Sequence, residues 1–519
     1  MKKVSRPTLP PLGLFCLFLN IGLTEASKSS ASAPDRGAGM FHRLSREHGP
    51  DKAKYDLTDI GKLLIDIKTD GPRMSESISE LNAAALEGEI IAGLDMDVAQ
   101  CRKSIQEGLV SNNLTDQAIS LMAQAKYVEA EQKSIASAGK NVSQSMEAAV
   151  FDYRLAASAC FFRKEYRSMM DHCHAALKIA PQERAPLLWG TLQIDLGDAM
   201  RLLARTEKVT GDELWIQASR AYEAAAEINA REISPKEWAI IQRKLSRTLS
   251  ERAENSQNSQ RGNLLAQAVT AAQGALEVFN LDEFPDDYAN THFNLGNIYL
   301  IQANGLNRSA RDEKNALIDK GIGSFRSALA AVRFSDYPSR WASLHQNLAI
   351  ALMRRATGQQ GGDGIKSIYQ AIEANSEAHK FYTREDRPHS WAEVHHNLGL
   401  AFRMMATGQP KDRAVPLLQG AMQHYRDALE IYTREAFPQD WATTQVAAGR
   451  GFEDLAMQME DTERTDLLKE AEKSYESALE IWTSSDQPDS YREALGRLEK
   501  VREKLKATLK TNRQALCQP

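Results

Sequence analysis

A short motif, Pro-x-x-(Trp or Tyr), returns about every fifty residues along this chain and constrains its fold more than any other feature. It occurs at Pro186/Trp189, Pro235/Trp238, Pro285/Tyr288, Pro338/Trp341, Pro388/Trp391, Pro438/Trp441 and Pro488/Tyr491. The steps between successive prolines are 49, 50, 53, 50, 50 and 50 residues. A period of this length indicates an array of structural repeats.

Each proline is predicted to begin a helix, because its fixed φ suits the first helical turn and its missing N–H is not needed there. After Pro388, apolar and small residues follow at helical spacing until the Gly/Pro punctuation at residues 407–410. A second apolar periodicity then runs from Ala414 to Tyr432. Each repeat is therefore predicted to be a pair of helices.

One helix pair cannot bury its apolar stripe alone, so the pairs are expected to stack on one another. The Trp or Tyr of each motif is interpreted as part of the core between repeats. Polar or Gly-rich stretches, such as residues 255–262 and 357–364, are predicted to be turns between paired helices.

Residues 150–181 resemble a single tetratricopeptide repeat (TPR) of ordinary length. The matching positions are Tyr153, Ala157, Tyr166, Ala176, Leu177 and Pro181, whereas Met169 and Cys173 replace the family's usual Ala and aromatic. The fifty-residue repeats resemble a long TPR variant of bacterial multi-repeat proteins, whose first helix carries motifs like Asn294-Leu-Gly296 and Asn397-Leu-Gly399. The resemblance covers about residues 148–511. It implies an all-α fold, a right-handed α-solenoid of stacked antiparallel helix pairs.

The expected organisation follows from these patterns. It comprises a signal peptide at 1–26, a disordered linker at 27–50, a helical region with a degenerate TPR-like hairpin at 51–147, a standard-length TPR at 148–185, six long repeats at 186–487, a capping helix at 488–512 and a tail at 513–519. The region 51–147 is either an N-terminal cap or a set of divergent repeats, and the sequence leaves both open.

The N-terminus reads as an export signal. Lys2, Lys3 and Arg6 precede a mostly apolar run over residues 12–23, and small residues follow near Ala26. That run is too short to span a bilayer. The expected location is therefore periplasmic or secreted, with membrane contact only through an uncleaved N-terminal segment. The alternative is a cytoplasmic protein whose translation starts at Met40.

Charge and motifs argue against several function classes. The formal net charge is −5, so the chain lacks the basic character of a nucleic-acid-binding protein. The Gly-rich stretch at 357–364 lacks the Lys-Ser/Thr of a phosphate-binding loop. We therefore expect no nucleic-acid partner and no small-molecule cofactor.

Histidines are the first candidates for chemistry. Seven residues after each of the first six prolines stand Gln193, Gln242, His292, His345, His395 and Gln445. Equivalent residues of adjacent packed helices are about 10 Å apart, whereas a metal needs ligands about 2 Å from one ion. This column is therefore interpreted as polar rungs, with no metal site and no catalytic residues. Cys173 lies between His172 and His174, but neighbours on a helix diverge, so no Cys–His nucleophile is expected.

The TPR resemblance implies a binding site instead. In that family the position nine residues after the proline lines the concave groove, where Asn can hold the backbone of an extended peptide through its donor and acceptor. The candidates here are Asn294, Asn347 and Asn397, with Asn290, Asn297, Glu393 and Arg450 nearby.

The same resemblance places Cys160 and Cys173 on facing helices of one hairpin. An oxidising compartment would permit a disulfide between them.

The predicted function is a non-enzymatic scaffold or adaptor that binds a protein or an extended peptide in its concave groove. Two alternatives stay open, namely a self-assembling structural protein and a regulatory subunit of a signalling enzyme.

Overall fold

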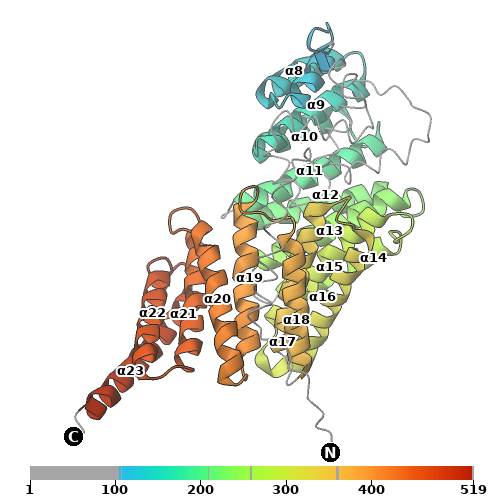
Figure 1. Ribbon diagram of the computed structural model, residues 1–519. Coiled ribbons are helices and arrows are strands. Elements are labelled where there is room, and N and C mark those ends of the chain that lie inside the picture. Colours follow the sequence, from blue (N-terminus) through green and yellow to red (C-terminus); the bar gives the residue numbers. More distant parts are fainter. Residues whose placement is uncertain (1–104, 107, 208–209, 257–259, 358–361, 517–519) are drawn as a thin grey trace, which may run out of the picture. The chain divides into compact units, whose positions relative to one another are not determined.

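The structure is a computed structural model that describes residues 105–106, 108–207, 210–256, 260–357 and 362–516. Within these ranges the regular structure is helical, with no β-strand (Figure 1). The predicted signal peptide (1–26), the linker (27–50) and residues 51–104 lie outside the described residues. The chain divides into two compact bodies, and the division falls between Leu344 and His345.

The N-terminal body holds successive helix pairs. Their bounds are α7 Leu114–Ala123, α8 Tyr127–Asn141, α9 Met146–Phe162, α10 Tyr166–Ile179, α11 Pro186–Thr206, α12 Gly211–Ile228, α13 Pro235–Asn255, α14 Gln260–Leu276, α15 Pro285–Gly305 and α16 Arg311–Ala331, with a 3₁₀ turn, η3, at Arg308–Ala310. Each helix contacts the next, so the pairs stack as the repeat pattern predicts.

The division between the bodies falls inside α17 (Pro338–Thr357). The remaining helices are α18 Gly362–His379, α19 Pro388–Ala406, α20 Lys411–Ile431, α21 Pro438–Ala456, α22 Asp461–Leu479 and α23 Pro488–Leu516. Here too α19 pairs with α20 and α21 with α22, and α20 contacts α21. The prediction of an all-α array of stacked antiparallel helix pairs is confirmed, while the handedness of the array stays a prediction.

Every proline of the motif is the first residue of a helix. In each repeat the N–H of the Trp or Tyr donates to the carbonyl of the residue before the proline, for example Trp391 to Arg387 at 2.9 Å and Trp441 to Phe437 at 2.8 Å. The motif spacing is therefore the spacing of the first helical hydrogen bond.

A glycine eleven residues after the proline brings the paired helices together. A Cβ on Gly399 would lie 2.5 Å from Cε1 of Tyr425, and one on Gly197 would lie 2.8 Å from Cε1 of Tyr222. The same contact joins Gly296 to Phe325 and Gly449 to Tyr475. The Gly of the Asn-Leu-Gly motif is thus required because an aromatic side chain of the second helix occupies the space of its side chain.

The aromatic residues of the motif join successive repeats, as predicted, although they are half-buried at the edge of the core. Trp391 and Trp441, from α19 and α21, both pack around Ala428 of α20 and Tyr432, which follows that helix. Trp238 and Tyr288 pack in the same way around the buried Phe279, which follows α14.

The helix pairs before Pro186 share one turn geometry. Ala125, between α7 and α8, has φ 57°, and Lys164, between α9 and α10, has φ 61°. Each turn is closed by an equivalent backbone hydrogen bond, from Lys126 N–H to the Leu121 carbonyl in one and from Glu165 N–H to the Cys160 carbonyl in the other, both 2.9 Å. The pairs α7/α8 and α9/α10 therefore turn in the same way, while the assignment of residues 51–147 to a cap or to divergent repeats stays open.

The last helix, α23, closes the stack of the C-terminal body. Its inward face buries Ala494, Leu498, Val501 and Leu505 against α22. A helix thus begins at Pro488, as the motif predicts, while its role as a cap stays a prediction. None of the described helices is both long enough and apolar enough to cross a bilayer.

Candidate functional site

Buried charge gathers on one kind of helix. Among the described residues, every buried Asp, Glu, Lys or Arg lies on the first helix of a pair. These residues are Asp152, Asp195, Asp198, Arg201, Arg243, Lys244, Asp287 and Glu453. The second helices bury chiefly apolar and small side chains, so the first helices carry the polar face of the array.

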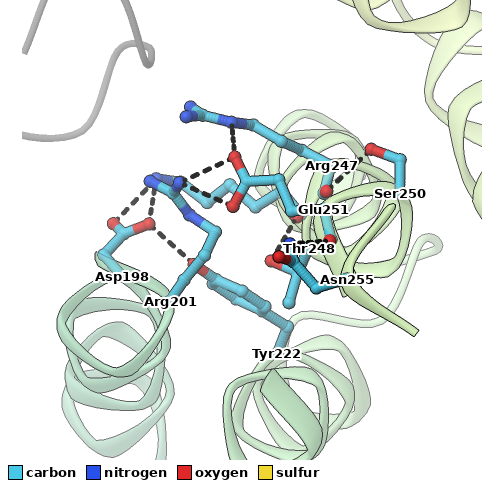
Figure 2. Close-up of polar contacts among 9 residues, drawn as sticks. Asp198, Arg201, Tyr222, Arg247, Thr248, Ser250, Glu251 and Asn255 are labelled. Atoms are coloured by element: carbon cyan, nitrogen blue, oxygen red, sulfur yellow. Dashed lines mark hydrogen bonds and ion pairs between the residues drawn. The ribbon is translucent and has the colours of Figure 1, made fainter. Parts of the chain in front are cut away.

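The densest group, here called the charge network, joins α11, α12 and α13 (Figure 2). Asp198 accepts hydrogen bonds from Lys244 Nζ at 2.8 Å (Oδ2) and from the Tyr222 hydroxyl at 2.7 Å (Oδ1). Glu251 Oε1 accepts from Arg247 Nε at 2.9 Å and from Arg201 Nη1 at 3.2 Å. The network thus pairs its buried charges across successive repeats.

Cations outnumber carboxylates in and beside this network. Arg243 pairs with Asp287 at 3.3 Å and adds a further buried guanidinium. Burial, together with the positive charge of Arg201, lowers the pKa of Arg247 to about 9. Burial raises the pKa of Glu251, but Arg201 and Arg247 outweigh it, so that pKa is lowered. The charge network therefore stabilises the ionised carboxylate of Glu251 and destabilises the protonated form of Arg247.

One ion pair recurs along the array. Arg201 and Glu251 stand fifteen and sixteen residues after their prolines. Arg403 and Asp454 occupy the same two positions and pair at 2.9 Å. Glu453 and Lys504 also occupy them, with the charges reversed, and pair at 2.9 Å. The recurring pair indicates that this position sets the register between neighbouring first helices.

The asparagines predicted to bind a peptide differ in how far they are exposed to solvent. Asn290, Asn294 and Asn297 lie half-buried on α15. Asn347 and Asn397 are only 9% and 6% exposed. The structure gives the Asn397 side-chain nitrogen no hydrogen-bond partner among the described residues. Among these asparagines, the three on α15 are therefore the more accessible to a ligand.

The two other predicted groove residues lie on different first helices of the C-terminal body. Glu393 is half-buried on α19. Arg450, on α21, forms an ion pair with Glu493 of α23. Burial and the neighbouring Arg497 and Arg403 lower the pKa of Arg450. Its charge is therefore already engaged within the array.

Alignment of the repeats within the chain did not predict one group, which we call the histidine cluster. It consists of His379 of α18, His395 of α19, and His424 and Asp427 of α20. His395 Nε2 lies 3.2 Å from His379 Nε2, and His395 Nδ1 lies 3.3 Å from His424 Nδ1. Burial, reinforced by His395, lowers the pKa of His379 and of His424 to about 4. The interpretation of His395 as a polar rung compared only residues at its own repeat position, whereas His379 and His424 come from other positions.

The cysteine pair considered from the sequence is not joined in the structure. Cys160 and Cys173 are both buried without a disulfide. The Cys160 thiol donates instead to Glu131 Oε1 at 3.2 Å, which also lies 2.7 Å from His172 Nε2. Burial and Glu131 raise the pKa of Cys160 above its usual range, which disfavours a reactive thiolate.

These features define the class of protein as an all-α repeat array of helix pairs with a polar first-helix face. Comparisons with known proteins add only a resemblance of fold. A human IFIT1 dimer with m7Gppp-AAAA superposes with a TM-score of 0.32 at 14% identity, covering 90% of this chain and 94% of that one.

Two further similar structures are the P58(IPK) TPR domain, with a TM-score of 0.19 at 12% identity, and yeast Tom70, with a TM-score of 0.24 at 11% identity. Both cover 77% of this chain, and 98% and 96% of their own chains. Scores this low carry no argument about function. No protein-family model and no curated protein matches the chain.

Proposed function

We propose that this chain is a non-enzymatic scaffold that binds an extended segment of a partner protein along its first helices. The observation that carries the proposal is the concentration of buried charge on those helices. Such a face can recognise a chain through its polar groups, whereas an apolar face would serve further stacking. Contacts between α13 and α15 place two first helices next to each other.

The half-buried amides of α15 suit the backbone of the bound segment, since each side chain offers a donor and an acceptor. The charge network suits an acidic group, because Nη2 of Arg247 is buried without a hydrogen-bond partner among the described residues and could donate to one. The proposed ligand is therefore an extended peptide with an acidic side chain or a C-terminal carboxylate.

The test is selection of binding peptides from a displayed random library against the full chain, followed by fluorescence anisotropy with each selected peptide. We expect acidic sequences, and affinities weakened about tenfold by Arg247→Gln and by Asn294→Ala, equivalent to about 1.4 kcal/mol. Matched controls on second helices are Arg220→Gln of α12 and Asn263→Ala of α14, both at exposed residues. They should bind like the wild type.

Failure to select any peptide, or equal weakening by the controls, would contradict the proposal. Analytical ultracentrifugation of the same protein covers the alternative of a self-assembling structural protein. Reversible growth of the assembly with concentration would favour that alternative.

A further inference from the structure

The histidine cluster has the arrangement of a metal-binding site. His395 Nδ1 lies 3.3 Å from His424 Nδ1 and 3.0 Å from Asp427 Oδ2, and the remaining distance, from His424 Nδ1 to Asp427 Oδ2, is 4.0 Å. A point inside this triangle lies about 2 Å from all three atoms, which is the length of zinc–nitrogen and zinc–oxygen bonds. The three donor atoms therefore surround a space of the size of one ion.

The surrounding side chains hold two of these three groups in place. His395 Nε2 faces His379 Nε2 at 3.2 Å, and a proton donated there from His395 Nε2 leaves the lone pair on Nδ1, its donor atom in the triangle. Asp427 Oδ1 accepts from Gln423 Nε2 at 2.8 Å, which leaves Oδ2 for the same centre. Outer contacts of this kind orient ligands in known metal sites.

The cluster is also open enough for an ion to enter. The side chains of His424 and Asp427 retain 24% and 22% of their exposure, while His395 retains 10% and lies against Trp391 with a ring separation of 4.0 Å. The Trp391 ring therefore covers the His395 side of the site, whereas the polar side chains of His424 and Asp427 are partly exposed to solvent. One coordination position would be left for water or for a donor from a partner.

Two imidazoles of the cluster are specific to this place in the array. His424 stands fourteen residues before Pro438, where the preceding and following repeats have Ala374 and Ser474. His379, nine residues before Pro388, replaces a Leu of other repeats, namely Leu276, Leu329, Leu429 and Leu479. Asp427, eleven residues before Pro438, stands where the preceding repeat has Glu377, so the two added imidazoles beside this carboxylate set the cluster apart.

A second group of candidate ligands, Glu131, Cys160 and His172, is less suited to an ion. Glu131 Oε2 is already bound to Arg163 Nη1 at 2.6 Å, and the Cys160 thiol donates to the same carboxylate. Asp427 instead faces two imidazoles and an amide. The histidine cluster thus keeps its negative charge available.

We propose that His395, His424 and Asp427 bind one divalent transition-metal ion of the Zn²⁺ type, with His379 as a positioning residue. Two imidazole nitrogens and one carboxylate oxygen are ligands that Zn²⁺ commonly takes. The bound ion ties α19 to α20, and so stabilises one hairpin of the C-terminal body. This proposal does not depend on the peptide-binding function.

The experiment titrates Co²⁺, and then Zn²⁺ as competitor, into the untagged, metal-free full chain. We expect one Co²⁺ per chain, with the intense visible absorption of a low-coordinate cobalt site and no sulfur-to-cobalt charge-transfer band. Zn²⁺ should displace it and raise Tm. Because outer-shell changes weaken binding by about 10–100-fold, His379→Leu should fall in that range, and loss of a ligand should exceed it.

The ligand variants take residues that neighbouring repeats already carry, which protects the fold: His395→Gln, His424→Ser and Asp427→Ser, with Asp427→Asn as an isosteric second choice. His292→Gln is the matched control, since His292 occupies the same repeat position as His395 without the cluster. Cys160→Ala controls for the other group. Lack of saturable Co²⁺ binding, or binding unchanged in His395→Gln, or loss in either control, would overturn the proposal.

Discussion

The charge network on α11–α13 and the histidine cluster on α18–α20 are built on helix pairs of the same design. They differ in whether their charged and polar side chains are paired within the chain. Gly197 meets Tyr222 beside the network, and Gly399 meets Tyr425 beside the cluster. The network consists of charged groups that pair with one another, such as Lys244 with Asp198. The cluster places three imidazoles around a single carboxylate, and burial lowers the pKa of two of them, His379 and His424.

This difference teaches that the repeat fixes the backbone, while a few positions decide the chemistry. The paired charges of the network join neighbouring first helices, as Lys244 of α13 and Asp198 of α11 do. In the proposed metal site, a cation from outside binds the imidazoles and the one carboxylate of the cluster. Disrupting each region should therefore have different consequences.

The largest effect is expected from breaking the network. Asp198→Ala leaves the buried Lys244 ammonium without its carboxylate and the Tyr222 hydroxyl without its acceptor. Removing one partner of a buried ion pair costs about 3–5 kcal/mol. Urea denaturation followed by circular dichroism measures the loss.

The double variant Asp198→Leu/Lys244→Met sharpens this test. Replacing both partners by apolar groups of similar size is often close to neutral. We therefore expect it to recover most of the stability lost in Asp198→Ala. If the double variant is as unstable as the single one, the pairing does not account for the effect.

A smaller effect, equal in the two regions, is expected at the shared hairpin contact. Gly197→Ala and Gly399→Ala each insert a methyl group within 2.8 Å or less of a buried tyrosine ring. Overpacking of this kind costs about 1–3 kcal/mol. Thermal melts should show similar losses for both, whereas Gly323→Ala, with nothing near its added Cβ, should be neutral or slightly stabilising.

The smallest effect concerns pH and separates a solitary histidine from the cluster. Burial lowers the pKa of His292 below the ordinary value of about 6.5. The unfolded chain therefore takes up the proton first, and stability is lost as the pH falls below about 6.5. The denaturation midpoint should fall less between pH 7.5 and pH 5 in His292→Gln than in the wild type. Identical pH dependence would contradict this account.

The sequence predicts the helix pairs and their starts well, because the residues that determine them lie close together in the chain. A proline at the first helical position and an aromatic three residues later define each start, and every such start is confirmed. The Asn-Leu-Gly motif marks the first helix, and the structure adds the reason for its Gly, which is the aromatic ring of the second helix.

The clusters could not be predicted in the same way. Sequence comparison aligns residues at one position of successive repeats, such as His345 and His395. The histidine cluster joins four different positions, one nine residues before a proline, one seven after it, and two that lie fourteen and eleven before the next. Only the packing of α18, α19 and α20 brings them together. The burial of Asn347 and Asn397 likewise depends on neighbouring helices, which spacing along the chain does not reveal.

The most direct test of the central claim is hydrogen exchange, read by mass spectrometry, on the full chain with and without a selected peptide. The account predicts that protection on binding concentrates in the first helices α11, α13 and α15. Protection confined to the second helices α12, α14 and α16 would contradict it.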